Sequence, residues 1–200
     1  MSLAKSLAFV FLLLLFSSTF SFAQPAQAPV PDTLNGLQVR IEPAKPDFPA
    51  GETPEFRVTL SNVGDKDLVL NLGTVLANGR KQYASAVVLL WKPLPSPVTK
   101  NAGPTELLLP RGPGGVPGRV DPFIVPLPAG ASYVLKASLK DYGVAGRPLE
   151  PKPGRYEVTA IYTGAAAAFR NPDTAGFALL TVWLGKISSK PVAFTITAKP

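Results

Sequence analysis

The sequence predicts an all-β protein built as a single antiparallel β-sandwich with long Pro/Gly-rich loop insertions. About ten segments have the length and composition of strands. The clearest of them alternates apolar Phe56, Val58 and Leu60 with polar neighbours, which is the period of a strand with one face buried. The chain holds 23 prolines and 17 glycines, most of them between apolar runs, as short strands joined by turns require. The best helical candidate, residues 165–168, is stopped by Pro172.

The first residues have the pattern of a signal peptide over 1–23. Lys5 precedes an apolar run at 7–16, and Ser21-Phe22-Ala23 offers small residues at the positions that a signal peptidase reads. We therefore expect cleavage between Ala23 and Gln24, and export to the periplasm or the extracellular space. An uncleaved anchor is the alternative, but the apolar core is shorter than the roughly 20 residues that span a bilayer. No Cys follows the run to carry a lipid, and no later run is long enough to span a membrane.

Residues 24–35 are rich in Pro, Ala and Gln, which predicts a flexible linker before a sandwich domain over 36–200. Three strands are expected next, at 37–41, 55–61 and 68–72. Asn78-Gly79 is the strongest hairpin signal, because both central residues of a type I′ turn need positive φ. It leads to a strand through 86–91 whose apolar run is continuous, which suits a strand covered on both faces. Trp91 is expected to anchor the core.

Residues 92–119 are expected to form a long exposed loop. The segment from Arg111 to Arg119 contains four glycines and two prolines but lacks the spacing of a dinucleotide or phosphate loop. Prolines also remove backbone donors that a phosphate cradle needs. The two arginines remain a weak candidate for an anion-binding loop.

The second half of the chain predicts strands at 120–125, 133–139, 155–162, 177–184 and 192–196. Loops are expected at 141–154 and 164–176, and a turn at 185–190. In the central strand, Tyr156, Val158, Ala160 and Tyr162 should share the buried face, because strand side chains alternate. The Tyr156 hydroxyl should bond to the backbone within 149–153.

Three local patterns resemble immunoglobulin-like and fibronectin type III-like domains of secreted bacterial proteins. Residues 149–156 are similar to the approach to a tyrosine corner, although the spacing is one residue longer than usual. Ala50-Gly51-Glu52 precedes a strand that residues 62–65 follow, and residues 183–196 look like a closing hairpin. The likeness also extends to the fold of BsuPI-type proteinase-inhibitor domains. It covers about 37–72 and 127–198, and a shared fold of this kind does not fix a function.

The composition argues against catalysis. The chain has no His and no Cys, so it lacks the commonest general base and the usual zinc ligands. The acids expected in loops, each more simply a solvated turn residue, are Asp121, Asp141, Glu150 and Asp173. A Ser-Lys pair would have to combine Ser188 or Ser189 with Lys186 or Lys190, which fall in an expected turn. We therefore expect no enzyme activity and no cofactor.

Other sites have weak support. Asp65 and Asp67 are the best calcium candidates, but Lys66 lies between them. Tyr142 and Phe169 are candidate exposed aromatics for carbohydrate binding. The net charge is +7 with scattered Lys and Arg, which does not favour nucleic acid. The sequence thus predicts a non-catalytic exported binding or structural module whose partner is a protein or a cell-surface polysaccharide. The alternative is a proteinase inhibitor that presents the 92–119 loop.

Overall fold

The computed structural model describes residues 31–76, 82–95, 103–108, 119–144, 147–166, 176 and 179–198. The all-β prediction is confirmed, since the described part holds strands and short 3-10 segments such as η1 (Leu139–Asp141), and no α-helix is found among its residues. The strands, in chain order, are β1 (Thr33–Leu34), β2 (Leu37–Pro43), β3 (Asp47–Pro49), β4 (Glu55–Asn62), β5 (Leu68–Leu76), β6 (Gln82–Tyr83), β7 (Val87–Pro93), β8 (Thr105–Leu107), β9 (Val120–Leu127), β10 (Ser132–Ser138), β11 (Gly143–Val144), β12 (Arg147–Pro148), β13 (Gly154–Gly164), β14 (Gly185–Ser188) and β15 (Val192–Thr197).

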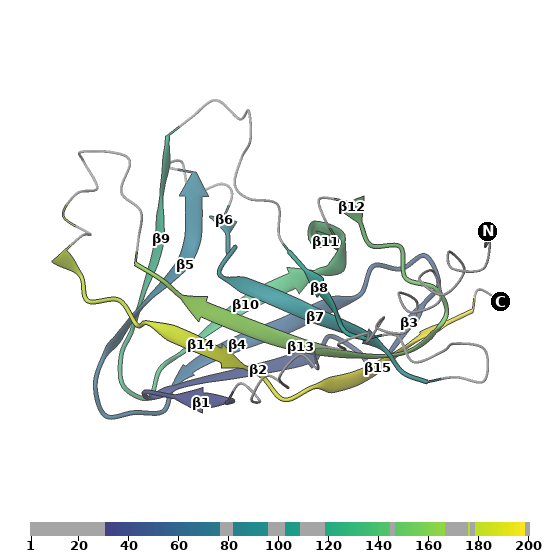
Figure 1. Cartoon of the computed structure of the whole chain (residues 1–200), viewed down its shortest axis with the longest axis horizontal. Coiled ribbons are helices and arrows are strands. Elements are labelled where there is room, and N and C mark those ends of the chain that lie inside the picture. The colour runs from purple at the N-terminus through teal and green to yellow at the C-terminus, as the bar shows by residue number, and fades with distance from the viewer. Residues whose placement is uncertain are drawn as a thin grey trace, which may run out of the picture.

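Two sheets form the sandwich and run along the long axis of the view in Figure 1. The first has the order β1-β2-β4-β10, and the second has the order β3-β15-β13-β7-β8 with β14 also paired to β13. Most pairs are antiparallel, as expected. The pair of β3 with β15 is parallel, however, and brings Asp47 beside Thr195. The expectation of a purely antiparallel sandwich is corrected there, because β3 crosses from the first sheet to join the edge of the second.

A third sheet, β6-β5-β9, rises from one end of the sandwich in Figure 1. The register of β5 against β9 shifts between Asn71 and Thr74, so β5 carries a bulge there. Gly73 lies in the bulge with φ 132°, and its N–H donates to Asn71 Oδ1 at 3.2 Å. The Tyr162 hydroxyl donates to the Asn71 carbonyl at 3.2 Å, which ties this sheet to β13.

Aromatic rings from both sheets form the centre of the core. Phe56 on β4 meets Phe194 on β15 at a centroid distance of 5.2 Å, which joins the two sheets directly. Phe48 lies 5.9 Å from Phe194 in an edge-to-face arrangement, and Trp91 lies 4.4 Å from Tyr156. Such offset and edge-to-face pairs are favourable because of the ring quadrupoles. The β3 crossover is therefore held by burial of Phe48 as well as by its backbone.

The register expected for the central strand is confirmed in β13. Tyr156, Val158, Ala160 and Tyr162 are all buried, and none is more than 8 % exposed. Glu157 is only half-buried and pairs with Lys92 at 3.5 Å across the strands. The Tyr156 hydroxyl donates to the Lys152 carbonyl at 2.6 Å, inside the segment where its partner was expected.

Replacing Tyr156 with phenylalanine should lower the free energy of unfolding by about 1 kcal/mol, because the ring stays and only this hydrogen bond is lost. Urea denaturation with the slope held common to both proteins would measure the change. Tyr133→Phe is the matched control, since Tyr133 is half-buried and its ring packs on Phe123 at 6.2 Å. If Tyr156→Phe lowers the free energy of unfolding no more than Tyr133→Phe does, the hydrogen bond from Tyr156 to Lys152 does not stabilise the fold.

Two expectations about β7 and its neighbours are revised. Trp91 is buried as expected, but Val88 and Leu90 on the other face are only half-buried, so β7 is not fully covered on both faces. The expected loop over 92–119 contains β8, because Leu107 is completely buried against Leu89. Likewise, the expected loop over 141–154 contains the short β11–β12 pair.

The end of the chain differs most from the sequence-based expectation. Residues 179–184, expected in a strand, form none, and the expected turn at 185–190 contains β14. Strand β14 forms because Ile187 is fully buried opposite Tyr162. The expected closing hairpin is also wrong, since β14 and β15 both pair with β13. Ser189 bridges the two, accepting from the Ala160 N–H at 2.9 Å.

The expected linker over 24–35 ends before Thr33, because Thr33 and Leu34 form β1 and pair with β2. Asn35 and Gly36 connect the two strands with φ of 48° and 79°, the signature of a type I′ turn. Asn35-Gly36 is therefore an Asn-Gly hairpin turn that lies within the described residues. Asn78-Gly79 lies outside the described residues, so this prediction is not tested.

Candidate functional site

A cleft of about 420 Å³ opens at the end of the sandwich where β4 begins. Three segments far apart in sequence converge on it: the β3–β4 loop, η1, and the approach to β13. Ile196 of β15 closes the base. The volume falls within the range of about 300–1,000 Å³ typical of ligand pockets. The lining residues are Gly51, Glu52, Thr53, Pro54, Leu139, Lys140, Leu149, Glu150, Pro151 and Ile196.

The floor of the cleft is fixed by the core and by backbone bonds. Leu139 and Ile196 are buried, with exposed fractions of 1 % and 2 %. The Leu139 N–H donates to the Pro54 carbonyl at 2.9 Å, which joins η1 to the start of β4. Leu149 is half-buried against the core, and the Tyr156–Lys152 bond fixes the wall just beyond it. The apolar surface is therefore held in place by the fold itself.

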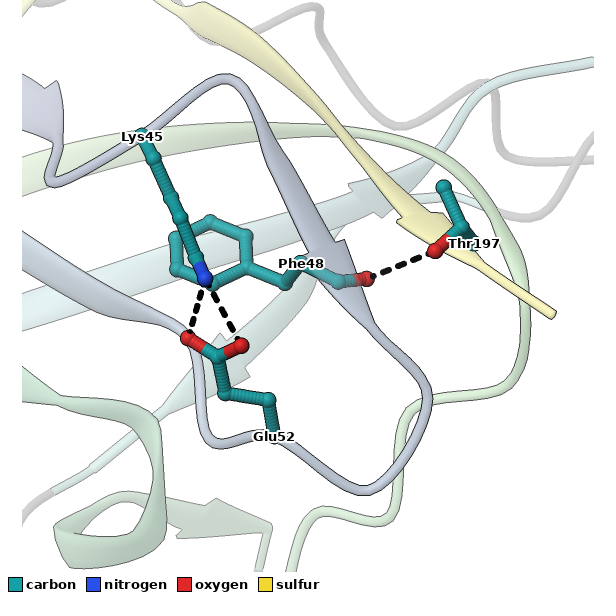
Figure 2. A network of polar contacts seen from close by, with 4 residues as sticks. All are labelled: Lys45, Phe48, Glu52 and Thr197. Atoms are coloured by element: carbon teal, nitrogen blue, oxygen red, sulfur yellow. Dashed lines mark hydrogen bonds and ion pairs between the residues drawn. The ribbon is translucent and has the colours of Figure 1, made fainter. Parts of the chain in front are cut away.

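The rim carries charges of both signs, contributed by Glu52, Lys140 and Glu150. Glu52 is held by Lys45, whose ammonium lies 2.6 Å and 2.7 Å from the two carboxylate oxygens (Figure 2). The same ammonium lies 5.4 Å from the centre of the Phe48 ring, within cation–π range. The Thr197 hydroxyl donates to the Phe48 carbonyl at 3.5 Å on the other side (Figure 2). The Lys45–Glu52 ion pair thus neutralises the Glu52 side of the rim. Glu150 and Lys140 are the remaining charged residues of the rim.

Of the acids singled out in the sequence, the cleft takes in only Glu150. Asp141 is exposed, and Asp121 pairs with Arg119 through a 2.8 Å contact from Nε to Oδ1. Asp173 lies outside the described residues. Among the described residues, Glu150 is therefore the one of these four acids that lines the cleft.

Of the two arginines proposed as an anion site, the structure describes one. Arg119 is committed to Asp121, and Arg111 lies outside the described residues. Only short pieces of the 92–119 segment are described, and the central one is β8 at the edge of the second sheet.

The candidate Ser-Lys pair has a structural role. Ser189 is 4 % exposed, and its hydroxyl donates to the Lys190 carbonyl at 2.9 Å and accepts from the Ala160 N–H. Its proton and one lone pair are therefore occupied by the backbone. Lys190 extends to Asp32 at 3.5 Å. These contacts hold the junction of β14 and β15.

The weaker sites are also accounted for. Asp67 accepts the Ala129 N–H at 3.0 Å and so joins two turns, and among the described residues no group of three acidic, His or Cys side chains is placed to hold a metal. Tyr142, expected as an exposed sugar platform, is only 4 % exposed, so this expectation is wrong. Burial and the adjacent Asp141 carboxylate raise the pKa of the Tyr142 hydroxyl well above its usual value. Phe169 lies outside the described residues.

Within the described ranges, no helix has the length and apolarity to cross a bilayer. The charged side chains of the cleft are Glu52, Lys140 and Glu150, all exposed at its rim, and its lining contains no aromatic ring. Aliphatic and proline side chains dominate the rest, which is the chemistry of a surface that binds an apolar side chain.

No protein-family model matches the chain, and no curated protein sequence matches it. Solved structures resemble the chain only at low scores, and three of them are named here. They are Northeast Structural Genomics Consortium target SoR45 (TM-score 0.36, 11% identity, 82% of this chain and 89% of that chain), the macrocyclisation catalyst AvmM of alchivemycin A biosynthesis (0.33, 17%, 86% and 98%) and a β-glucosidase from Listeria innocua (0.33, 13%, 82% and 16%). This chain thus matches only a small part of the glucosidase, and likeness at these scores carries no argument about activity.

Sequence reasoning missed most of the cleft. The sequence places Pro54 in a turn and Leu139 and Ile196 in strands, and nothing in their local pattern brings the three together. The available signal was Gly51-Glu52-Thr53-Pro54 before a clear strand, since loops at one end of a sandwich gather together.

Proposed function

We propose that this protein is an exported, non-catalytic binding module with an immunoglobulin-like sandwich, and that the end cleft binds an apolar side chain of a protein partner. The observation that carries the proposal is the cleft itself, preformed and aliphatic with charges only at its rim. A buried apolar pocket rimmed by polar groups is the usual form of a recognition site.

Strand order supports the immunoglobulin-like part of the proposal. Taken in chain order as A, B and E, strands β2, β4 and β10 are neighbours in one sheet. Taken as C, F and G, strands β7, β13 and β15 are neighbours in the other. Trp91 is buried on the C equivalent, and Tyr156 bonds back to the chain near the start of the F equivalent, both as in that fold. The chain departs from the pattern at β9, which pairs with β5.

A protein partner is favoured over a polysaccharide because of the lining. Sugars present many hydroxyls, which an aliphatic cleft would desolvate without replacing their hydrogen bonds. A leucine-sized side chain loses no such bonds there. The loops that form the cleft lie at one end of the sandwich, the position from which immunoglobulin-like domains commonly present their binding loops.

Photocrosslinking in the exporting cell tests the proposal in one experiment. A benzoylphenylalanine residue in place of Glu150, at the cleft rim, should form an adduct with a protein partner. Edman sequencing of this chain from the adduct should begin at Gln24, as cleavage after Ala23 requires. The matched control places the same residue at Val63, which is 55 % exposed at the opposite end of β4.

Equal adducts at both positions, or none at Glu150, would contradict the cleft as the binding site. A chain that still begins at Met1 would contradict export. Incubation with a panel of proteases separates the remaining alternative: tight inhibition that survives Leu149→Glu would favour an inhibitor acting through residues 92–119 instead.

A further inference from the structure

Strand β10 forms one edge of the first sheet, and its outer side has no partner strand among the described residues. It is seven residues long and pairs with β4 over its whole length, from Ser132↔Ser61 to Ser138↔Glu55. The preceding strand, β9, turns away and pairs with β5 in the third sheet. An edge of this length without proline presents backbone groups to which another strand can bond.

Hydrogen bonds at the two ends of β10 show which residues face outward. The Asn62 N–H donates to the Ala131 carbonyl at 2.9 Å, and the Leu139 N–H donates to the Pro54 carbonyl at 2.9 Å. In an antiparallel ladder, bonds to one neighbour come from alternate residues. Odd-numbered residues of β10 therefore bond to β4, and the N–H and C=O groups of Val134 and Lys136 point away from the sheet.

The side chains along this edge also suit an added strand. Val134 is 48 % exposed on the outer face and has Thr59 of β4 beside it on one side, but no described strand on the other. Tyr133 and Leu135 point the other way and are only half-buried against the core. An apolar residue opposite Leu135 would complete the burial of that side.

Charge selects the chemistry of the added strand. Glu42, Arg57 and Lys136 lie in one row across β2, β4 and β10. The two residues of this row nearest the open edge, Arg57 and Lys136, are therefore both basic. The acidic residue, Glu42, lies on β2, away from the edge. An acidic side chain opposite Lys136 would pair favourably across the strands, whereas a basic one would be repelled. The same repulsion disfavours a second copy of this chain in the registers that place Lys136 against itself.

We propose that the β10 edge binds an extended segment of a partner protein as an additional antiparallel strand. The segment has an acidic residue opposite Lys136, an apolar residue opposite Leu135 and a β-branched residue opposite Val134. Backbone bonds to Val134 and Lys136 supply affinity, and the alternating side chains supply selectivity, as in other cases of strand addition. This surface lies on β10, apart from the end cleft, so the two sites can be tested separately.

Amide hydrogen exchange on the mature chain tests the free state first. The amides of Val134 and Lys136 should exchange much faster than those of Tyr133 and Leu135 in the same strand, because only the odd-numbered ones are bonded to β4. A short synthetic peptide with the core Glu-Leu-Val should slow exchange at Val134 and Lys136. The same peptide with Lys in place of Glu should bind more weakly.

Two variants make the test specific. Lys136→Glu should weaken binding of the Glu peptide by about fivefold in Kd and strengthen binding of the Lys peptide, because it reverses the cross-strand charge. Val134→Pro removes an outward N–H and leaves the β4 ladder intact, so it should abolish binding of both peptides. Lys136→Glu changes only an exposed side chain, so the charge test stands even if the proline variant fails to fold.

Three results would overturn the proposal. Slow exchange of Val134 and Lys136 in the dilute free monomer would mean that the chain covers its own edge. Protection that grows with protein concentration, together with a dimer in analytical ultracentrifugation, would assign the edge to a second copy. Binding with no preference between the Glu and Lys peptides would remove the proposed selectivity.

Discussion

Replacing Trp91 with alanine is expected to lower the free energy of unfolding by about 3–5 kcal/mol, the cost of deleting a large buried aromatic side chain. The ring is 4 % exposed. It lies 4.4 Å from Tyr156 and 5.2 Å from Phe194, so its loss leaves a cavity shared by β7, β13 and β15. Equilibrium unfolding in urea, followed by circular dichroism, would measure the change.

Val134→Ala serves as the control for Trp91, because Val134 is an exposed apolar residue on β10 and should change stability by less than about 0.5 kcal/mol. Trp91→Phe should fall between the two, since it keeps part of the aromatic packing. A loss below about 1 kcal/mol for Trp91→Ala would mean that the ring contributes little to the core.

Gly73→Ala is expected to cost about 3–5 kcal/mol, the sum of backbone strain and overpacking. Gly73 has φ 132°, which side chains rarely adopt. A Cβ at this position would also lie 2.3 Å from the Tyr83 carbonyl oxygen and 2.8 Å from the Ser85 nitrogen. The Tyr83 oxygen belongs to β6 and the Ser85 nitrogen to the turn that follows it, so relief requires this backbone to move away from β5.

Gly130→Ala isolates the strain, since Gly130 has φ 76° but nothing within 4 Å of an added Cβ. It should cost roughly 1–2 kcal/mol. Thermal unfolding of both variants gives the comparison. Equal losses for Gly73→Ala and Gly130→Ala would show that the approach of Tyr83 to Gly73 does not constrain the bulge.

The elements predicted well from sequence are those whose local pattern matches their environment. In β4 and β13, alternation at Phe56 and Tyr156 reports one buried face, and the tertiary structure uses that face. The segment at 185–188 fails because Gly, Lys and Ser indicate a turn, while burial of Ile187 against β13 makes it a strand. Pairing with a long central strand outweighs weak local preference.

The site could not be predicted in the same way. Its lining comes from two loops, the 3-10 helix η1 and one strand, whose contacts are set by the topology, so no single stretch of sequence contains the cleft. The alternation in β10 is visible in the sequence and placed Tyr133 and Leu135 on one face. Strand β10 lies at an edge because β9 pairs with β5 and not with β10. Nothing in the local sequence of β9 indicates that pairing. The free edge is therefore a property of topology alone.

The parallel pairing of β3 with β15 has a consequence for the order of folding. Phe48 and Ile196 are brought side by side although most of the sequence separates them, and β15 also flanks the central strand β13. Contacts between such distant residues form slowly, because a long loop must close before they contribute any stability. A nascent chain therefore cannot complete the second sheet until residues 192–197 have left the ribosome. Until then the second sheet lacks both its parallel pair and the strand that flanks the first half of β13.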